Sequence, residues 1–488
     1  MMKTSILQKT AGIAAVLALW TGASFIIGDG LIPAPWQICI AAGGLLLNTD
    51  AMLHVVTTVL RVTAAFVAAL FAGTILGIAR GIHPFIESTT SPFISFFQGI
   101  PPILWAIPLL FITGFIPVSP VIVITLIILP LIAVNVTEGV KAIPGEYYEM
   151  LRVFSSRKKL HIRNLVIPVL FPYLSSSIRL GLILGIKGSV AAEYFTANNG
   201  IGFMINTAGY SADIPLLFTW GLIILFLIFI FNRLLDGLFT LFSFNKKRIR
   251  DVEKSLLFIP DIREKRITDE ILPLRPVELK NLSFSWHSRH GKPDGILLEK
   301  IGLTVREKTT AVISGDSGIG KTTLLKIIAG ILHADAGTCT KQLSSSFLFQ
   351  DDRLLPWYSV IHNVALPLLE NGIPREPAYR KAVELLKQVG LQNAMLAFPD
   401  ELSGGMKRRA CLARCFAARN DCILLDEPFN GLHKKARKQL FTVFMELWKI
   451  HPCPVVVATH FPEELPADRI FRHYTLSGNP ATLKKTFV

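Results

Sequence analysis

Charged residues are scarce in this sequence. Only 17% of its 488 residues are Asp, Glu, Lys or Arg, and its mean hydropathy is +0.48. Soluble globular proteins carry about 25% charged residues, so this composition excludes a chain that is soluble throughout. The length allows two or more domains, and part of the chain is expected to lie in lipid.

Cysteines are also few, and none forms a CxxC pair. The six are Cys39, Cys339, Cys411, Cys415, Cys422 and Cys453. Five lie in the half predicted below to be cytosolic, where thiols stay reduced, and we interpret the cysteines as packing residues. Cys411 and Cys415 are four residues apart on an expected helix and could form a metal pair, but nothing nearby completes a four-ligand site.

The net charge of +15 has two possible explanations. Clustered positive charge is typical of nucleic-acid binding, but here basic residues stand beside apolar runs, as at 157–159 and 246–248. Positive residues that flank membrane spans are expected on the cytoplasmic side. We therefore predict a membrane protein with membrane lipid, and no nucleic acid, as its partner.

Six apolar runs are long enough to cross about 30 Å of hydrocarbon. They lie near 11–28, 55–79, 91–116, 119–140, 169–192 and 214–242. The first could instead be a signal peptide, because Lys3 and Lys9 precede it, but we favour a helix because further spans follow. With a cytoplasmic N-terminus, the segments that face outward contain no Lys or Arg; they are 29–54, 117–118 and 193–213. The charge asymmetry thus predicts six crossings with both ends inside.

Glycine and proline recur within these runs, at 99–102 and at Gly181, Gly185 and Gly188. They permit close helix packing and locally broken helices. Arg61, Arg179 and Lys187 are ionisable residues inside or at the edges of spans. Such residues are expensive in lipid and suggest a function, Lys187 most strongly as a solute contact; the alternative is that each pairs structurally or reaches the interface.

A charged, proline-containing stretch over 245–275 is interpreted as a cytoplasmic linker. After it, short apolar strands alternate with helical segments, as in an α/β domain. One strand candidate, 311–314, precedes a GxxxxGKT motif and a helical pattern. The predicted phosphate-binding residues are Gly315, Asp316, Ser317, Gly318, Ile319, Gly320, Lys321, Thr322 and Thr323.

The motif has a direct chemical interpretation. Its glycines let backbone N–H groups surround phosphate oxygens at a helix N-terminus, Lys321 reaches the β- and γ-phosphates, and Thr322 offers a hydroxyl to Mg²⁺. Farther along, the buried-strand pattern 422–425 ends in Asp426 and Glu427. These supply one carboxylate for the metal and one to orient the attacking water.

Between these motifs, Leu402-Ser403-Gly404-Gly405-Met406 resembles the LSGGQ signature of ABC ATPases, with Met406 in place of Gln. Gln350 and His460 follow strand candidates in the family's order and spacing. The resemblance implies that Ser403, Gly404 and Gly405 contact ATP, that Trp286 stacks on adenine, and that Gln350 and His460 sense the γ-phosphate, with Gln350 also near the metal. Trp286 could alternatively be a core aromatic of its strand.

The loop over 141–168 resembles the coupling loop of binding-protein-dependent ABC import permeases. Glu149, Arg152 and Ile167-Pro168 match the pattern, whereas Met150, Leu151 and Ser155 replace Ala, Ala and Gly. The stretches 99–110, 190–205 and 349–357 look like the nitrate, taurine and sulfonate branch. Two departures concern the ATPase: His433 and Phe461 stand where the family has Asp, and the first removes a carboxylate that normally bridges two ATPase domains.

The expected fold is a multidomain chain: an all-α polytopic membrane domain with six transmembrane helices (1–244), the linker (245–275) and an α/β P-loop ABC ATPase domain (276–488). The resemblance implies an importer in a bacterial plasma (inner) membrane, with a cytoplasmic ATPase that uses ATP and Mg²⁺. Expected partners are a second half-transporter, most economically a second copy, and an extracytoplasmic solute-binding protein.

Two alternatives remain at this point: a half-exporter, and a membrane-bound ATP-dependent regulator without transport. The coupling-loop match disfavours the exporter, and only His433 and Phe461 support the regulator. Branch resemblance suggests a sulfonate, nitrate or related small anion, although relatives carry neutral and cationic vitamin precursors and fold alone does not choose among solutes.

Overall fold

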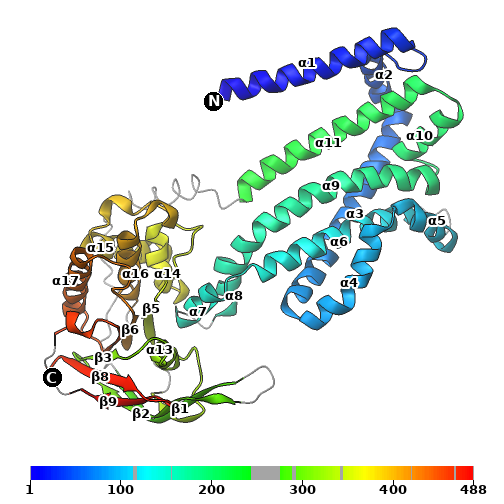
Figure 1. Ribbon diagram of the computed structural model, residues 1–488. Coiled ribbons are helices and arrows are strands. Elements are labelled where there is room, and N and C mark those ends of the chain that lie inside the picture. Colours follow the sequence, from blue (N-terminus) through cyan, green and yellow to red (C-terminus); the bar gives the residue numbers. More distant parts are fainter. Residues whose placement is uncertain are drawn as a thin grey trace. The chain divides into compact units, whose positions relative to one another are not determined.

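The computed structural model of the chain describes residues 2–113, 118–154, 157–242, 275–287, 293–340, 344–418, 420–466 and 469–486. The chain forms two compact units (Figure 1). The first combines Met1–Ile143 with Val166–Ser243, and the second combines Pro144–Leu165 with Phe244–Val488. The predicted linker, 245–275, lies outside the described residues except for Arg275, and the predicted domain limits stay a prediction.

The first unit is helical. Its helices are α1 (Met2–Ile27), α2 (Pro35–Leu47), α3 (Thr49–Ile82), α4 (Pro84–Gly99), α5 (Pro102–Thr113), α6 (Ser119–Lys141), α9 (Ile167–Thr196), α10 (Ile201–Tyr210) and α11 (Ile214–Phe242). Among the described residues, four helical stretches are long and apolar enough to cross a membrane: Thr49–Ile82, Ser119–Lys141, Lys159–Thr196 and Ile214–Thr240. Ala11–Ile27 and α2 are shorter apolar helices.

The crossing expected over 91–116 is not one helix. α4 ends at Gly99, and α5 begins at Pro102. Ile100 has an extended backbone (φ −95°, ψ 130°), because the residue before a proline is driven out of the helical region and Pro101 itself has no N–H to donate. An uninterrupted helix over 91–116 is therefore wrong, whereas the local break that residues 99–102 were expected to permit is present. The described part of the membrane unit has four long apolar helices and several shorter ones.

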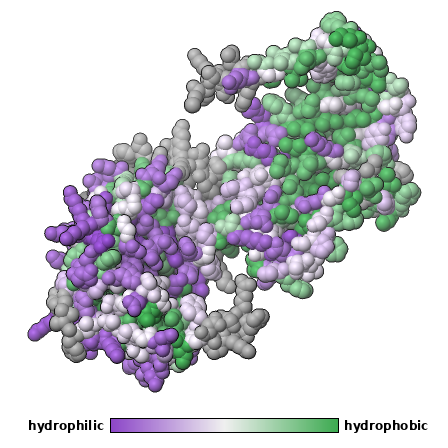
Figure 2. Space-filling view, viewed as in Figure 1, coloured by the Kyte–Doolittle hydropathy of each residue, from purple (hydrophilic) through white to green (hydrophobic). Residues whose placement is uncertain are grey.

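The core of the first unit lies between α3, α6 and α9. Its buried side chains include Val62, Ile124, Ile128 and Leu182. Close approach needs glycine at the crossing of α3 and α6, where a Cβ on Gly77 would lie 2.6 Å from Val136 Cβ. The outer surface of the helices is largely hydrophobic (Figure 2), as expected for helices that face lipid.

The second unit contains two sheets. A three-stranded sheet has the order β2-β1-β4, and a six-stranded sheet has the order β5-β6-β7-β3-β8-β9. The strands are β1 (Val277–His287), β2 (Pro293–Val305), β3 (Thr310–Ser314), β4 (Ala336–Cys339), β5 (Ser345–Leu348), β6 (Cys422–Asp426), β7 (Val455–Ala458), β8 (Phe471–Ser477) and β9 (Thr482–Lys485). From β5 to β8 the larger sheet is parallel.

The second unit also contains the helices α13 (Lys321–Ile328), α14 (Val360–Glu370), α15 (Arg375–Gln388), α16 (Gly404–Cys415) and α17 (Lys434–Ile450). They pack against the parallel sheet or, in the case of α14 and α15, against other helices (Figure 1). The register pairs Ile313 of β3 and Asp426 of β6 with the same residue of β7, Ala458. The carboxyl ends of these three strands therefore meet at one edge, where ligands of open α/β sheets bind.

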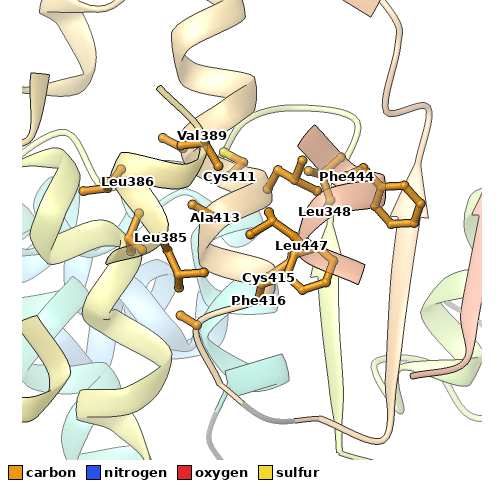
Figure 3. Close-up of a cluster of buried hydrophobic side chains, with 14 of the residues drawn as sticks. Leu348, Leu385, Leu386, Val389, Cys411, Ala413, Cys415, Phe416, Phe444 and Leu447 are labelled. Atoms are coloured by element: carbon orange, nitrogen blue, oxygen red, sulfur yellow. The ribbon is translucent and has the colours of Figure 1, made fainter. Parts of the chain in front are cut away.

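The predicted packing role of the cysteines holds for most of them. Cys411 and Cys415 lie in the core beside Leu348 and Phe444 (Figure 3). Burial raises the pKa of these two thiols to about 11 and about 12. Cys39, however, is exposed on α2, so the packing role is wrong there. Among the described residues no group of three His, Cys, Asp or Glu side chains forms a metal site.

The segment Pro144–Leu165, the coupling segment below, folds with the second unit although it lies between helices of the first. It contains α7 (Gly145–Phe154), α8 (Lys158–His161) and most of a π-helical turn, Ile162–Val166. Met150, Leu151 and Phe154 are buried on one face of α7. Chain order assigns this segment to the permease, but its apolar face packs in the second unit.

Candidate nucleotide site

The glycine-rich loop, 315–322, runs from the end of β3 into α13. Gly315, Gly318 and Gly320 have φ values of 154°, 81° and 107°, which residues with a Cβ rarely adopt. At Gly320 a Cβ would also lie 2.9 Å from Leu298 Cδ2. The glycines therefore allow a tight turn that directs backbone N–H groups inward at a helix N-terminus, an arrangement that suits phosphate.

Lys321 lies at the centre of this loop. Its Nζ donates hydrogen bonds to Gly315 O at 2.8 Å and to Asp316 O at 3.0 Å, and it lies 3.2 Å from His460 Nε2. Burial lowers the pKa of Lys321, although neighbouring carboxylates oppose the shift. The ammonium group is thus desolvated and bound by backbone carbonyls. A phosphate, which carries full negative charge, would stabilise it further.

Thr322 and Asp426 form the oxygen-rich side of the site. Thr322 Oγ1 donates to Asp426 Oδ1 at 3.1 Å, and Asp426 is 1% exposed. Burial raises the pKa of Asp426, and the adjacent Glu427 charge adds to the rise. Carboxylate and hydroxyl oxygens are the ligands that Mg²⁺ takes from proteins that bind nucleotides, so these residues fit a phosphate-bound magnesium ion.

Glu427 and His460 complete the constellation. Glu427 Oε1 lies 3.3 Å from His460 Nε2 and 3.9 Å from Lys321 Nζ, and Oε2 accepts from His460 N at 3.2 Å. Glu427 has a positive φ of 46°, unusual for a residue other than glycine. Its Oε1 is buried and accepts no hydrogen bond from the described residues, so the carboxylate has an acceptor in reserve.

Arg408, which sequence reasoning missed, holds these strand ends together. This side chain of α16 is 3% exposed and donates to five backbone carbonyls: Phe349, Gln350, Asp426, Glu427 and Pro428. A planar guanidinium with five donors can satisfy such a set. In the sequence, Arg408 belongs to the run Lys407-Arg408-Arg409, which is indistinguishable from a solvated basic turn.

The signature segment does not join the nucleotide loop in the same chain. Ser403 and Gly404 are exposed at the start of α16, and Gly405 is half-buried. Ser403 Oγ accepts from Met406 N at 3.4 Å, which caps the helix. In the described part of the chain, no hydrogen bond or ion pair joins these residues to 315–322.

Two other predicted residues lie at the surface. Trp286 is 49% exposed and packs edge-on against Phe284 at 5.2 Å, so the alternative of a core aromatic is wrong. Gln350 has an exposed side chain, while its carbonyl is held by Arg408. Thr323 is buried in the first turn of α13. The roles of Trp286 and Gln350 toward the nucleotide stay predictions.

The two departures from the family pattern have structural partners. His433 Nδ1 accepts from Ala436 N at 3.2 Å, so His433 is the N-cap of α17. The guanidinium of Arg437 lies over the Phe461 ring, with Cζ 4.4 Å from its centroid. A cation–π contact thus joins the first turn of α17 to the segment after His460.

The coupling segment reaches elements of the nucleotide edge. Glu149 accepts from Lys326 of α13 at 3.0 Å and from Arg353 at 3.0 Å. Partial burial alone would raise the pKa of Glu149, but the hydrogen bonds from these two cations outweigh it and lower the pKa. Arg152, the other matching residue of the loop, is exposed.

In the membrane unit, Arg61 pairs with Glu193 at 3.1 Å, and both side chains are buried. Arg179 pairs with Asp236 at 2.7 Å, and Lys187 is exposed on α9. The structural alternative is therefore confirmed for Arg61 and Arg179.

Comparisons with known proteins agree with both halves. Residues 65–248 match the family described as binding-protein-dependent transport system inner membrane component, and residues 298–430 match the ABC transporter family.

The taurine import ATP-binding protein TauB of Rhizobium johnstonii is 39% identical over 175 residues, 34% of this chain and 67% of that protein. The aliphatic sulfonates import ATP-binding protein SsuB of Mycobacterium avium is 33% identical over 195 residues, 40% and 75%. TauB of Escherichia coli K12 is 38% identical over 182 residues, 36% and 70%.

Proposed function

Because the chain belongs to the ABC transporter family and joins a binding-protein-dependent permease domain to an ATPase domain, we propose that it imports a small anion. The transport is binding-protein-dependent, and the ATPase domain hydrolyses ATP for it. The structural observation that supports coupling of hydrolysis to transport is the pair of ion contacts of Glu149, which link the permease-derived coupling segment to α13 and Arg353 in one compact unit.

For the nucleotide-site residues we propose the roles that the family resemblance implies, and the positions of Lys321, Thr322, Asp426, Glu427 and His460 at one sheet edge support them. Bound MgATP supplies the phosphoryl group that passes to water, with the metal neutralising phosphate charge. Lys321 and the N–H groups of the loop bind the phosphates. Thr322 and Asp426, which are hydrogen-bonded to each other, would hold the metal, and the resemblance adds Gln350 to them. Glu427 orients the attacking water and accepts its proton with its spare oxygen, and His460 contacts the γ-phosphate.

We propose that the working unit contains two copies of the chain. Ser403 and Gly404 are exposed, and among the described residues they make no polar contact with the loop of their own chain, so a second copy can offer its signature segment to that loop. Two identical composite sites then form by a two-fold axis. Trp286, with an exposed ring, is available to stack on adenine.

The substrate and location are also proposals. TauB and SsuB carry taurine and aliphatic sulfonates in their names, which favours a sulfonate or a related small anion here. A solute-binding protein outside a bacterial inner membrane would deliver it to the permease domain, with the ATPase domain in the cytoplasm. The exporter alternative is disfavoured by the permease family, and His433 and Phe461, which supported a regulator, have structural partners instead.

The test uses the full chain in proteoliposomes with its solute-binding protein. Taurine, a short alkanesulfonate and nitrate are the probes, and Lys321→Ala is the inactive control. We expect ATP-dependent movement toward the ATPase side and hydrolysis stimulated by the loaded binding protein. Movement in the opposite direction would support the exporter, and hydrolysis that no loaded binding protein changes would support the regulator.

A further inference from the structure

The end of the coupling segment makes a second, separate contact with the ATPase domain. Asn164, in the π-helical turn, is 8% exposed. Its carbonyl accepts from Trp357 Nε1 at 3.0 Å, and its Oδ1 accepts from the Tyr358 hydroxyl at 3.1 Å. Its amide Nδ2 donates to Glu370 Oε1. Three residues of the ATPase domain thus bind three polar groups of one asparagine.

Glu370 is the unusual member of this group. It ends α14, is 0% exposed, and no step of ATP hydrolysis uses it. Its second oxygen accepts no hydrogen bond from the described residues. Burial raises its pKa, while the Asn164 hydrogen bond and the charges of Arg163 and Arg157 oppose the rise. A buried carboxyl whose hydrogen bond comes from the loop is costly to keep without that bond.

The two contacts of the segment involve different parts of the ATPase domain. Glu149 binds Lys326 and Arg353, which lie on elements that carry nucleotide-site residues. Asn164 binds the turn 357–358, which precedes α14, and Glu370, which ends it. The second contact therefore has no direct connection to the phosphate loop.

We propose that Asn164 and Glu370 form a buried pair that fixes the docked position of the permease loop on the ATPase domain. The inference rests on the proposed coupling through this segment. Glu149 requires only cations within reach of its carboxylate. Acceptance of Asn164 also requires an acceptor at 370 and the donors of Trp357 and Tyr358 in fixed places, and a mismatch leaves a polar group buried without a partner.

The test reverses the direction of one hydrogen bond. Asn164→Asp places two carboxyl groups against each other, and we expect uptake and stimulated hydrolysis to fall about tenfold or more. Glu370→Gln alone keeps an acceptor and should change either rate by less than about twofold. In the double variant, the amide introduced at position 370 donates to the carboxylate introduced at position 164, and activity should return to within about threefold of wild type.

A matched control is Glu376→Gln, which removes an acid from an exposed pair with Arg380 on α15 and should neither harm nor rescue. Thermal unfolding of the membrane-embedded full chain is measured for the same set. The unfolding temperatures should show the same non-additive pattern even if no transported solute is found. A failure of the proposed transport function can therefore be told apart from a failure of this proposal. Additive effects of the two substitutions, or an Asn164→Asp chain that behaves as wild type, would overturn the proposal. If Asn164→Asp does not accumulate, Asn164→Ala with and without Glu370→Leu gives the same comparison.

Discussion

Buried charges have different surroundings at the nucleotide edge and inside the membrane unit. In the membrane unit, Glu193 accepts from Thr58, Arg61, Ser189 and the backbone N–H of Gly202, so both of its oxygens are satisfied. At the nucleotide edge, Glu427 Oε1 has no hydrogen-bond donor among the described residues, and burial shifts the pKa of Asp426 and of Lys321 toward the neutral form.

The difference separates buried charges that maintain the structure from buried charges that bind a ligand or react. A buried ion pair whose hydrogen bonds are all made contributes shape and can be replaced by apolar side chains. Buried charges with unused capacity remain costly until a ligand completes them, and such groups concentrate at functional sites. We therefore expect the two sets to respond in opposite ways to substitution.

The largest effect is expected from a substitution at the nucleotide edge. Glu427→Gln keeps the shape and the phosphate loop but removes the proton acceptor, so hydrolysis should fall by about 10²–10⁴-fold while ATP binding persists. Binding of a fluorescent ATP analogue and phosphate release measure the two separately. Lys321→Ala should weaken the binding itself. Hydrolysis near the wild-type rate in Glu427→Gln would remove the assigned role.

The second prediction concerns sites shared between copies. Lys321→Ala and Ser403→Arg chains should each be inactive alone. A mixed dimer of the two has one site with both defects and one intact site. With random mixing, about a quarter of the wild-type rate per chain should return. Mixed dimers isolated with two affinity tags that remain inactive would show that the signature does not act across chains.

These two predictions depend on residues that could be located from the sequence. The strand ends at Ser314, Asp426 and Ala458 meet because neighbouring parallel strands end at one edge. The motifs predicted that Lys321 and Glu427 would lie there, the family resemblance added His460, and the structure brings the three side chains together.

Other features had no such signal. Arg408 recognises backbone carbonyls and Asn164 recognises three side chains, and neither contact imposes a periodicity on the sequence. Arg61 and Glu193 are 132 positions apart. The break at Ile100 is different, because Pro101 and Pro102 signal it and the sequence permitted a broken helix there. Only hydropathy, which continues across 91–116, suggested one uninterrupted run.

The third prediction tests the membrane side. Glu193→Ala leaves the Arg61 charge buried without its partner and should destabilise the chain by about 3–5 kcal/mol. The pair Arg61→Met with Glu193→Leu should recover much of this loss, because no uncompensated charge remains. Thermal unfolding in lipid nanodiscs measures both. The control Lys141→Ala removes a half-exposed pair with Glu87 and should leave the unfolding transition nearly unchanged, because exposed ion pairs contribute little. A double variant as unstable as Glu193→Ala would contradict a purely architectural role.

The smallest effects are expected in the coupling segment, where a paired charge and an exposed charge lie three residues apart. Glu149 is held by Lys326 and Arg353, whereas Arg152 is exposed. The resemblance to the coupling loop predicted a role for both residues, but in the described part of the chain only Glu149 of the two forms ion pairs with the ATPase domain. Glu149→Ala should change basal hydrolysis by less than about twofold. It should lower uptake and stimulated hydrolysis by about fivefold, which corresponds to the upper value of about 1 kcal/mol for an ion pair that solvent partly screens.

Arg152→Ala should change all three rates by less than about twofold, since exposed charges contribute little. Membrane content of each variant is verified first. Because coupling is reciprocal in binding free energy, Glu149→Ala should also weaken the effect of ATP on the affinity for the loaded binding protein. Equal losses in the two single variants would mean that the segment acts through its net charge, and the ion pairs with Lys326 and Arg353 would then not be the route between nucleotide and permease.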